Sequence, residues 1–146
     1  MRRSQKADYA LRAALDLALQ ASPSRLTRTA EIARRTGTPA KFLEAILGQL
    51  RRAGIAESQR GAGGGHRLAR PASRVSAGDV WRAVDGPLSL AGRPGRRRAA
   101  SEGPARAIHA LWAAVDEAVG RAVDGVSLED LARRSEEASS VPDFVI

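Results

Sequence analysis

The sequence contains no cysteine, and this absence excludes several classes of site at once. Without thiolates there is no disulfide framework, no cysteine-ligated zinc site, no cysteine nucleophile and no cysteine-held iron–sulfur cluster. Aromatic residues make up only 3% of the chain, too few for a platform that stacks single-stranded bases. There are two histidines and no HExxH, GxSxG or phosphate-loop pattern, so the sequence also argues against an enzyme.

Long apolar runs are missing as well. Asp8, Arg12 and Asp16 interrupt the first 20 residues, and no stretch approaches the 18 or more apolar residues of a membrane-spanning helix. We therefore expect no secretion signal, no membrane partner and a cytoplasmic location. The chain has 146 residues, 43% of them hydrophobic, which is enough to build one core without a disulfide or metal.

Positive charge is concentrated in the first half of the chain. Residues 1–75 hold 15 Lys and Arg against 5 Asp and Glu, whereas residues 76–146 hold 9 against 11. The arginines do not gather on one amphipathic helix with an apolar opposite face, so double-stranded DNA is a better candidate partner than a membrane surface. A general preference for surface arginine would predict even spreading, which the sequence does not show.

Hydrophobic spacing predicts a mainly α fold with one small β-hairpin, an α+β arrangement. Ser4 is placed to cap a first helix, a short helix opens at Thr29, and Pro39 suits the first turn of a third helix. Ser76 with Asp79 and Ser127 with Asp130 predict the capped starts of two later helices. In that third helix the apolar stripe is expected to contain these residues: Phe42, Leu43, Ile46, Leu47 and Leu50.

The predicted organisation has four parts. Residues 1–86 form a winged helix-turn-helix DNA-binding domain, and residues 87–104 form a Gly, Pro and Arg-rich loop that serves as an effector or linker region. Residues 105–137 form dimerisation helices, and residues 138–146 form a flexible tail.

The order helix, helix, turn, helix, hairpin is the pattern that carries the functional prediction. In a helix-turn-helix, outward side chains near the start of the recognition helix enter the major groove. Lys41 can reach a phosphate or a guanine, and Glu44 can accept from a cytosine amino group, although both are also compatible with ordinary solvated charges. The full set of residues predicted to contact DNA is Arg2, Ser4, Lys6, Thr29, Thr38, Ala40, Lys41, Glu44, Arg51, Arg60, Gly63, Gly64 and Gly65.

The glycine-rich segment 60–65 is expected to form the tip of the hairpin. Glycines leave the tip without side chains that would hold it off a narrow groove, and Arg60 beside them can enter a minor groove of high negative potential. A phosphate-cradling nest is the alternative, but it requires a helix after the glycines, and residues 65–68 favour a strand.

Several segments together resemble a known family, the IscR/NsrR/CymR-type winged-helix transcription regulators. They are Ser4 to Leu11, Phe42 to Gly54, the wing Arg60 to Leu68, Gly78-Asp79-Val80 with Ala83 to Gly86, and His109-Ala110-Leu111-Trp112. The resemblance covers about residues 1 to 133. It implies a sequence-specific transcriptional regulator, here a repressor, that binds a palindromic operator as a homodimer.

The chain departs from this family in the loop before the long helix. Cluster-binding members carry three cysteines there, at places that fall near Pro94, Ala100 and Arg106. We therefore expect no iron–sulfur cluster, no other cofactor and no metal. The resemblance gives Asp8 and His109 as positions where some relatives supply a non-cysteine ligand, but two such residues make an unfinished site. A basic run stands in the loop instead, and with His109 it forms a candidate effector site or an extra phosphate contact: Arg93, Arg96, Arg97 and Arg98.

The helix from Ala105 has an apolar stripe wider than one short following helix can cover, so a second copy is predicted to bury it. The predicted dimer contacts are Ile108, Leu111, Trp112, Val115, Val119 and Ala122. The alternative function is a protein-interaction module, or an effector-binding regulator responding to a small molecule or protein, with weak or lost DNA binding.

Overall fold

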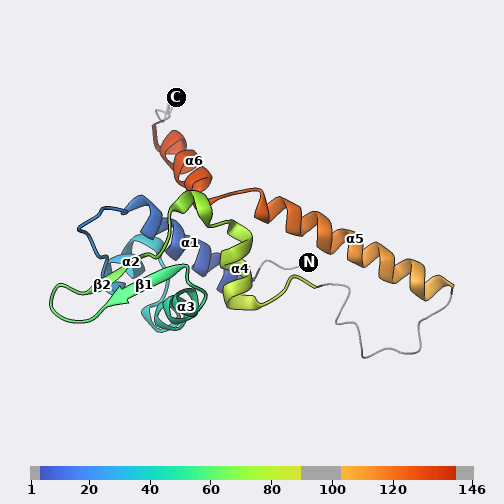
Figure 1. Cartoon of the computed structure of the whole chain (residues 1–146), viewed down its shortest axis with the longest axis horizontal. Helices are drawn as coiled ribbons and strands as arrows, with labels where there is room; N and C mark the ends of the chain where they lie inside the picture. The colour runs from blue at the N-terminus through green and yellow to red at the C-terminus, as the bar shows by residue number, and fades with distance from the viewer. Residues whose placement is uncertain (1–3, 90–102, 141–146) are drawn as a thin grey trace, which may run out of the picture.

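The computed structural model of the chain describes residues 4–89 and 103–140. A small antiparallel hairpin lies at one edge of a body of helices, and one long helix extends away from this body (Figure 1). The order is α1 (Gln5–Leu19), α2 (Thr29–Thr36), α3 (Ala40–Arg52), β1 (Ala56–Gln59), β2 (Gly65–Leu68), a short 3-10 turn η1 (Ala72–Arg74), α4 (Ala77–Asp85), α5 (Pro104–Asp124) and α6 (Leu128–Ser140). The predicted fold class, mainly α with one hairpin, is confirmed.

Local signals place the first three helices as expected. The Ser4 hydroxyl accepts a hydrogen bond from the Ala7 amide at 3.1 Å and caps α1. Gly37 ends α2 in the left-handed region with φ 66°, where a residue without Cβ is favoured. Pro39 lies just before α3, so its missing N–H costs no hydrogen bond.

One residue of the predicted stripe in α3 is not buried. Leu43, Ile46, Leu47 and Leu50 face the core, but Phe42 is 56% exposed. Phe42 lies at the edge of the buried stripe, where its ring approaches that of Tyr9 on α1 with centroids 6.3 Å apart. The core is already filled by the four aliphatic side chains, so the prediction that Phe42 belongs to it was wrong.

The hairpin has the register of a two-stranded wing. Ala56 pairs with Leu68 and Gln59 with Gly65, and a cross-strand ion pair joins Glu57 to Arg67. Thr27, before α2, adds an isolated antiparallel bridge to His66 on β2. The hairpin is therefore attached by its own backbone to the segment that leads into the helix-turn-helix.

The core lies between α1, α3, α4 and the base of the hairpin. Its largest fully buried side chains come from every part of the body, including Leu17, Ile32, Leu50, Val80 and Leu128. Burial of one such side chain contributes about 1.5 to 3 kcal/mol relative to exposure. The helix-turn-helix is thus one face of a packed domain.

Two capping boxes start α4 and α6 as predicted. Ser76 and Asp79 exchange hydrogen bonds of 3.0 Å, and Ser127 and Asp130 do the same. Between these caps, Ser76 and Ser127 form an antiparallel bridge. The chain returning from α5 is therefore attached to the body directly before α6.

The sixth helix differs from its predicted place. It packs against α1 and η1 and contributes the fully buried Leu128 to the core. It is part of the body of the protomer, and the prediction that residues 105–137 form dimerisation helices stays a prediction. It also runs to Ser140, so residues 138–140 of the predicted tail are helical, and residues 141–146 lie outside the described residues.

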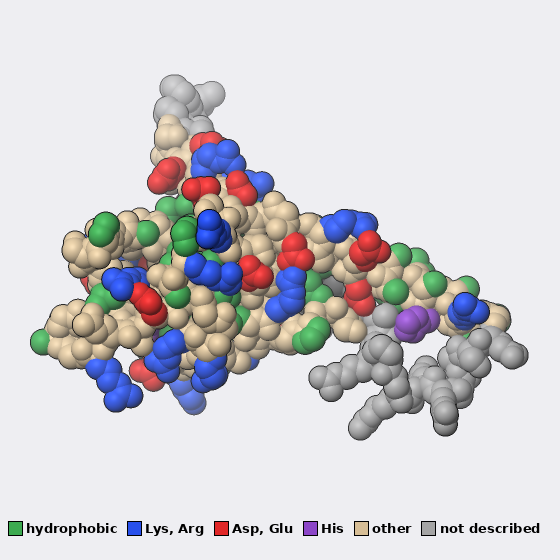
Figure 2. All heavy atoms as spheres, in the orientation of Figure 1, with side chains coloured by type: hydrophobic (Ala, Val, Ile, Leu, Met, Phe, Trp, Pro, Cys, Tyr) green, Lys and Arg blue, Asp and Glu red, His purple; other side chains and the backbone are tan. Residues whose placement is uncertain are grey.

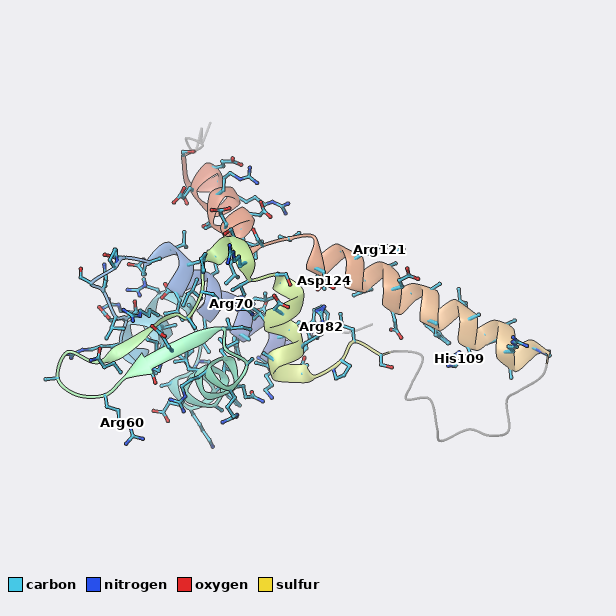
Figure 3. The ribbon with its side chains drawn as sticks, viewed as in Figure 1. Arg60, Arg70, Arg82, His109, Arg121 and Asp124 are labelled. Atoms are coloured by element: carbon cyan, nitrogen blue, oxygen red, sulfur yellow. The ribbon has the colours of Figure 1, made fainter. Side chains whose placement is uncertain are left out.

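Helix α5 extends from the body as a separate rod (Figure 1). Its 21 residues span about 31 Å at 1.5 Å per residue, and none of them is buried. At its C-terminal end, Arg82 of α4 donates to the Asp124 carboxylate at 2.7 Å, and the two side chains point toward each other in Figure 3. Over the described ranges, no helix is long and apolar enough to cross a membrane.

Candidate nucleic-acid interface

A part-buried ion pair joins the first helix of the helix-turn-helix, α2, to α1. Asp16 on α1 is buried, and both its oxygens accept from the Arg35 guanidinium on α2, at 2.7 and 2.9 Å. This hydrogen bonding raises the pKa of Arg35 further above its already high ordinary value. These two bonds join α2 to α1, and α3 packs against both of these helices.

The turn between α2 and α3 corrects one predicted contact. Thr38 is buried, and its hydroxyl lies 2.9 Å from the Thr36 hydroxyl, which donates to the Ile32 carbonyl at 2.7 Å. The side chain of Thr38 therefore holds the turn together and does not face solvent. The residues that do face solvent at the start of α3 are Ala40, Lys41, Phe42, Glu44 and Ala45.

The wing tip is built from closely packed backbone. The Gly64 amide donates to the Gly61 carbonyl at 2.9 Å, and a Cβ on Gly64 would lie 2.3 Å from the Gln59 carbonyl oxygen. Gly65 has φ 156°, and a Cβ there would lie 2.8 Å from the Thr27 carbonyl oxygen. The tip is thus a tight turn that only glycine fits at these two positions.

The wing and the helix-turn-helix enclose an open basic groove of about 470 Å³. Three arginines line it: Arg28 at the start of α2, Arg51 on α3 and Arg60 on the hairpin. Arg51 donates to the Ser58 hydroxyl at 3.0 Å, whereas Arg60 projects from the hairpin away from the body (Figure 3). Figure 2 shows Lys and Arg side chains gathered along the lower edge of the body, over α3 and the hairpin, whereas acidic and basic side chains mix over α6.

His66 forms part of the groove wall. Its Nε2 lies 3.1 Å from the Thr29 hydroxyl, which the sequence analysis placed among the DNA contacts. Burial, and to a lesser degree the nearby charge of Arg51, holds the pKa of His66 below its ordinary value of 6.5. The imidazole is therefore neutral near pH 7, and the positive charge of the groove comes from its arginines.

The N-terminal candidates are distributed differently from the prediction. Ser4 is occupied in capping α1, and the Lys6 ammonium donates to the Val84 carbonyl at 2.7 Å, near the end of α4. Lys6 therefore stabilises a helix C-terminus in this structure, and its contact with DNA stays a prediction. Arg2 lies outside the described residues.

The apolar side chains of α5 that lack a cover lie mainly in its first half. Ile108 and Leu111 are 55% and 56% exposed, and Trp112 is 45% exposed. Val115 and Val119 are already half-buried within the protomer, and Ala122 is exposed. The predicted stripe is present, but its largest uncovered area is near the N-terminus of α5.

Only one residue of the predicted effector region, His109, lies within the described residues. His109 lies exposed on α5, and the four loop arginines Arg93, Arg96, Arg97 and Arg98 lie outside the described residues. Within residues 4–89 and 103–140, no group of three or more His, Asp or Glu side chains is arranged to hold a metal ion.

Arg28 is the groove residue that sequence reasoning missed. Its Nη2 donates to the Ala62 carbonyl at the wing tip, at 2.6 Å. An arginine directly before the predicted start of α2 is only a weak signal of a DNA-binding residue. Nothing in the neighbouring sequence shows that the wing tip, 34 residues away in the chain, lies beside it.

Comparison with known proteins agrees with this geometry. The profile of the Rrf2 family, described as iron-dependent transcriptional regulators, matches residues 3–134. The chain belongs to the Rrf2 family. It is therefore a DNA-binding helix-turn-helix regulator of transcription, and this family is not one of enzymes.

Individual relatives cover most of the chain. A helix-turn-helix transcriptional regulator of Mycobacterium tuberculosis is 37% identical over 132 residues, which cover 90% of this chain and 81% of the relative. IscR of Xenorhabdus nematophila is 34% identical over 137 residues, covering 93% and 82%. Among solved structures, CymR of B. subtilis, described as a global cysteine regulator, has a TM-score of 0.76 at 31% identity and covers 92% of this chain and 98% of its own. IscR of T. potens has a TM-score of 0.77 at 27% identity, with 99% and 95% covered.

The residues of this Rrf2 family member do not fit an iron–sulfur cluster. Such clusters are held by cysteine thiolates, with histidine as a partial replacement in some centres. This chain contains no cysteine and only two histidines, His66 in the wing and His109 on α5. The donor set required for the cluster is therefore absent from the sequence.

Proposed function

We propose that this Rrf2 family member is a repressor that binds a palindromic operator in double-stranded DNA as a homodimer, without an iron–sulfur cluster. The observation that carries the proposal is the basic groove between the wing and α3, lined by Arg28, Arg51 and Arg60. In this arrangement α3 lies in the major groove and the wing tip in the adjacent minor groove. Such binding takes place where the chromosome lies, so we propose a cytoplasmic location.

The homodimer follows from the uncovered face of α5. A single winged helix contacts one half-site, and two half-sites about one helical turn apart require two protomers held at that spacing. The exposed side chains of Ile108, Leu111 and Trp112 on the projecting helix suit contact with a second copy, since a symmetric pair of helices would cover both stripes. An effector, either a small anion or a protein, is proposed for the region between α4 and α5.

The direct test is a gel shift with the DNA fragment upstream of the protein's own gene. We expect a specific complex whose half-sites are related by two-fold symmetry. Glu44→Ala should change base preference within each half-site, because Glu44 is exposed near the start of α3 and can accept from a cytosine amino group. Glu136→Ala on α6 is the matched control. Equal loss of affinity on every sequence for Glu44→Ala would remove Glu44 from base recognition.

The absence of a cluster is tested by reconstitution. After anaerobic incubation with iron and sulfide, the protein should show no visible absorption band and should bind the operator with unchanged affinity. Stoichiometric iron and sulfide with a visible band would contradict the proposal, because the bound cluster would then use ligands other than thiolates.

A further inference from the structure

One hydrogen bond joins the tip of the wing to the helix-turn-helix. The Arg28 guanidinium crosses the basic groove and donates to the Ala62 carbonyl at 2.6 Å. A hydrogen bond from a charged donor is about twice as strong as one between neutral groups. The contact links residues that are 34 positions apart and that belong to the two parts of the DNA-binding surface.

The backbone that carries Arg28 is itself held in place. Directly before it, Thr27 and His66 exchange two backbone hydrogen bonds of 2.8 Å. The Arg28 amide donates to the Glu31 carboxylate at 3.0 Å, and this bond holds the pKa of Glu31 below its ordinary value. The guanidinium therefore extends from a fixed base toward the wing tip.

The wing tip is tightly packed only at its base, around Gly64 and Gly65, and its outer residues have no packing of their own. Gly61, Ala62 and Gly63 are exposed, and a Cβ added at Gly61 or Gly63 would meet no atom within 4 Å. Glycine has the largest backbone entropy to lose, so the outer residues from Gly61 to Gly63 gain order from a contact with another part of the protein. Arg28 supplies such a restraint.

We propose that Arg28 is a positioning residue for DNA recognition: by holding the Ala62 carbonyl, it sets the wing at the distance from α3 at which Arg60 and α3 engage the same duplex. The proposal rests on the proposed function. Arg60 adjoins the tip and projects away from the body (Figure 3), so its place relative to α3 depends on where the tip is held.

A direct phosphate contact by Arg28 is the competing explanation, and a double-mutant cycle separates the two. If Arg28 acts through the wing, Arg28→Ala should weaken operator binding on the order of tenfold in the wild-type background. In the Arg60→Ala background the same change should have little further effect, because the side chain it positions is gone. The same fold-loss in both backgrounds would overturn the proposal and show that Arg28 acts independently of Arg60.

Wing order is measured without DNA. In Arg28→Ala, amide exchange and backbone relaxation at Gly61, Gly63 and Gly64 should show a more mobile tip, with the Gly64 amide losing protection. Arg25→Ala is the matched control, because Arg25 is also an exposed arginine in the segment between α1 and α2, so the variant loses the same charge. Unchanged tip motion in Arg28→Ala would overturn the proposal.

Loss of folding is not expected for these variants. Arg28 is exposed, and its side chain makes no capping hydrogen bond to α2, so the thermal unfolding midpoint should stay near that of the wild type. A wild-type protein that binds no palindromic DNA would refute the proposed function and the recognition role together. The tip-motion measurement then still decides whether Arg28 holds the wing.

Discussion

Trp112 on α5 offers the clearest test of the dimer. A tryptophan side chain buries up to about 250 Å². In the protomer 45% of Trp112 is exposed, which leaves about 110 Å² for a partner to cover. At about 25 cal/mol per Å², this area contributes about 3 kcal/mol in each protomer, or about 6 kcal/mol in a symmetric dimer. This figure is an upper bound, since part of each ring stays in contact with water.

The variant Trp112→Ala removes this contribution while leaving the core of the protomer untouched. Half of the upper bound, about 3 kcal/mol, raises the dimer Kd by about two orders of magnitude. Val119→Asp is a less clean probe, because Val119 is already half-buried within its own protomer. The charge could then destabilise the monomer as well as the dimer.

Sedimentation equilibrium over a range of concentrations measures this Kd. Glu117→Ala is the control, because Glu117 is exposed, points away from the apolar stripe and pairs only with Arg121 one turn later among the ion pairs of the described residues. A surface pair of this kind contributes little, so the control should remain dimeric. An unchanged dimer in Trp112→Ala would place the interface elsewhere. A monomeric Trp112→Ala that still binds the full palindrome tightly would refute the two-fold arrangement.

Three further outcomes follow from the same contacts. Operator affinity should fall steeply with salt, with a log–log slope near −9 if a dimer displaces about ten counterions; a slope shallower than about −3 would contradict the basic groove as the binding face. Arg35→Ala should lower the free energy of unfolding by about 3 to 5 kcal/mol, because it leaves the buried Asp16 carboxylate unpaired. Asp16→Ala should lower it by less, since Arg35 is 27% exposed and can reach water. Chemical denaturation compares the two variants, and a larger loss for Asp16→Ala would contradict this reasoning. His66 has a lowered pKa, so its neutral form stabilises the fold fully above about pH 6.5, and this contribution is lost as the pH falls below that value. Denaturation midpoints of His66→Gln should therefore vary less between pH 7.5 and 5.5 than those of the wild type or of the control His109→Gln.

Features that depend on neighbours in the chain could be predicted from the sequence. The caps at Ser4, Ser76 and Ser127 use side chains within three residues of the amides they serve. The left-handed turn at Gly37 and the glycine-rich hairpin tip are likewise set by local backbone preference. For this reason the helix-turn-helix and wing, and with them the class of function, could be recognised without a structure.

Side-chain roles that depend on a distant partner could not be predicted in the same way. The hydrogen bond from Lys6 to the end of α4 joins residues that are 78 positions apart, and no local signal in the sequence shows it. Thr38 looked exposed by helix position, but the turn folds its hydroxyl inward onto Thr36. Phe42 fits the apolar period of α3, yet α1 and α4 pack against the face that carries Leu43, Ile46, Leu47 and Leu50, which leaves Phe42 56% exposed.

The residues of the basic groove also divide into those that the sequence predicts and those that only the tertiary structure reveals. Sequence alone determined that Arg51 and Arg60 flank a hairpin and that positive charge dominates the first half of the chain. Only the tertiary structure decided that Arg28 reaches across to Ala62 and that α6 packs on α1 and not along α5. The physical reason is that periodicity and capping act over one or two helical turns, whereas these contacts exist only after loop closure brings distant segments within hydrogen-bond or van der Waals distance.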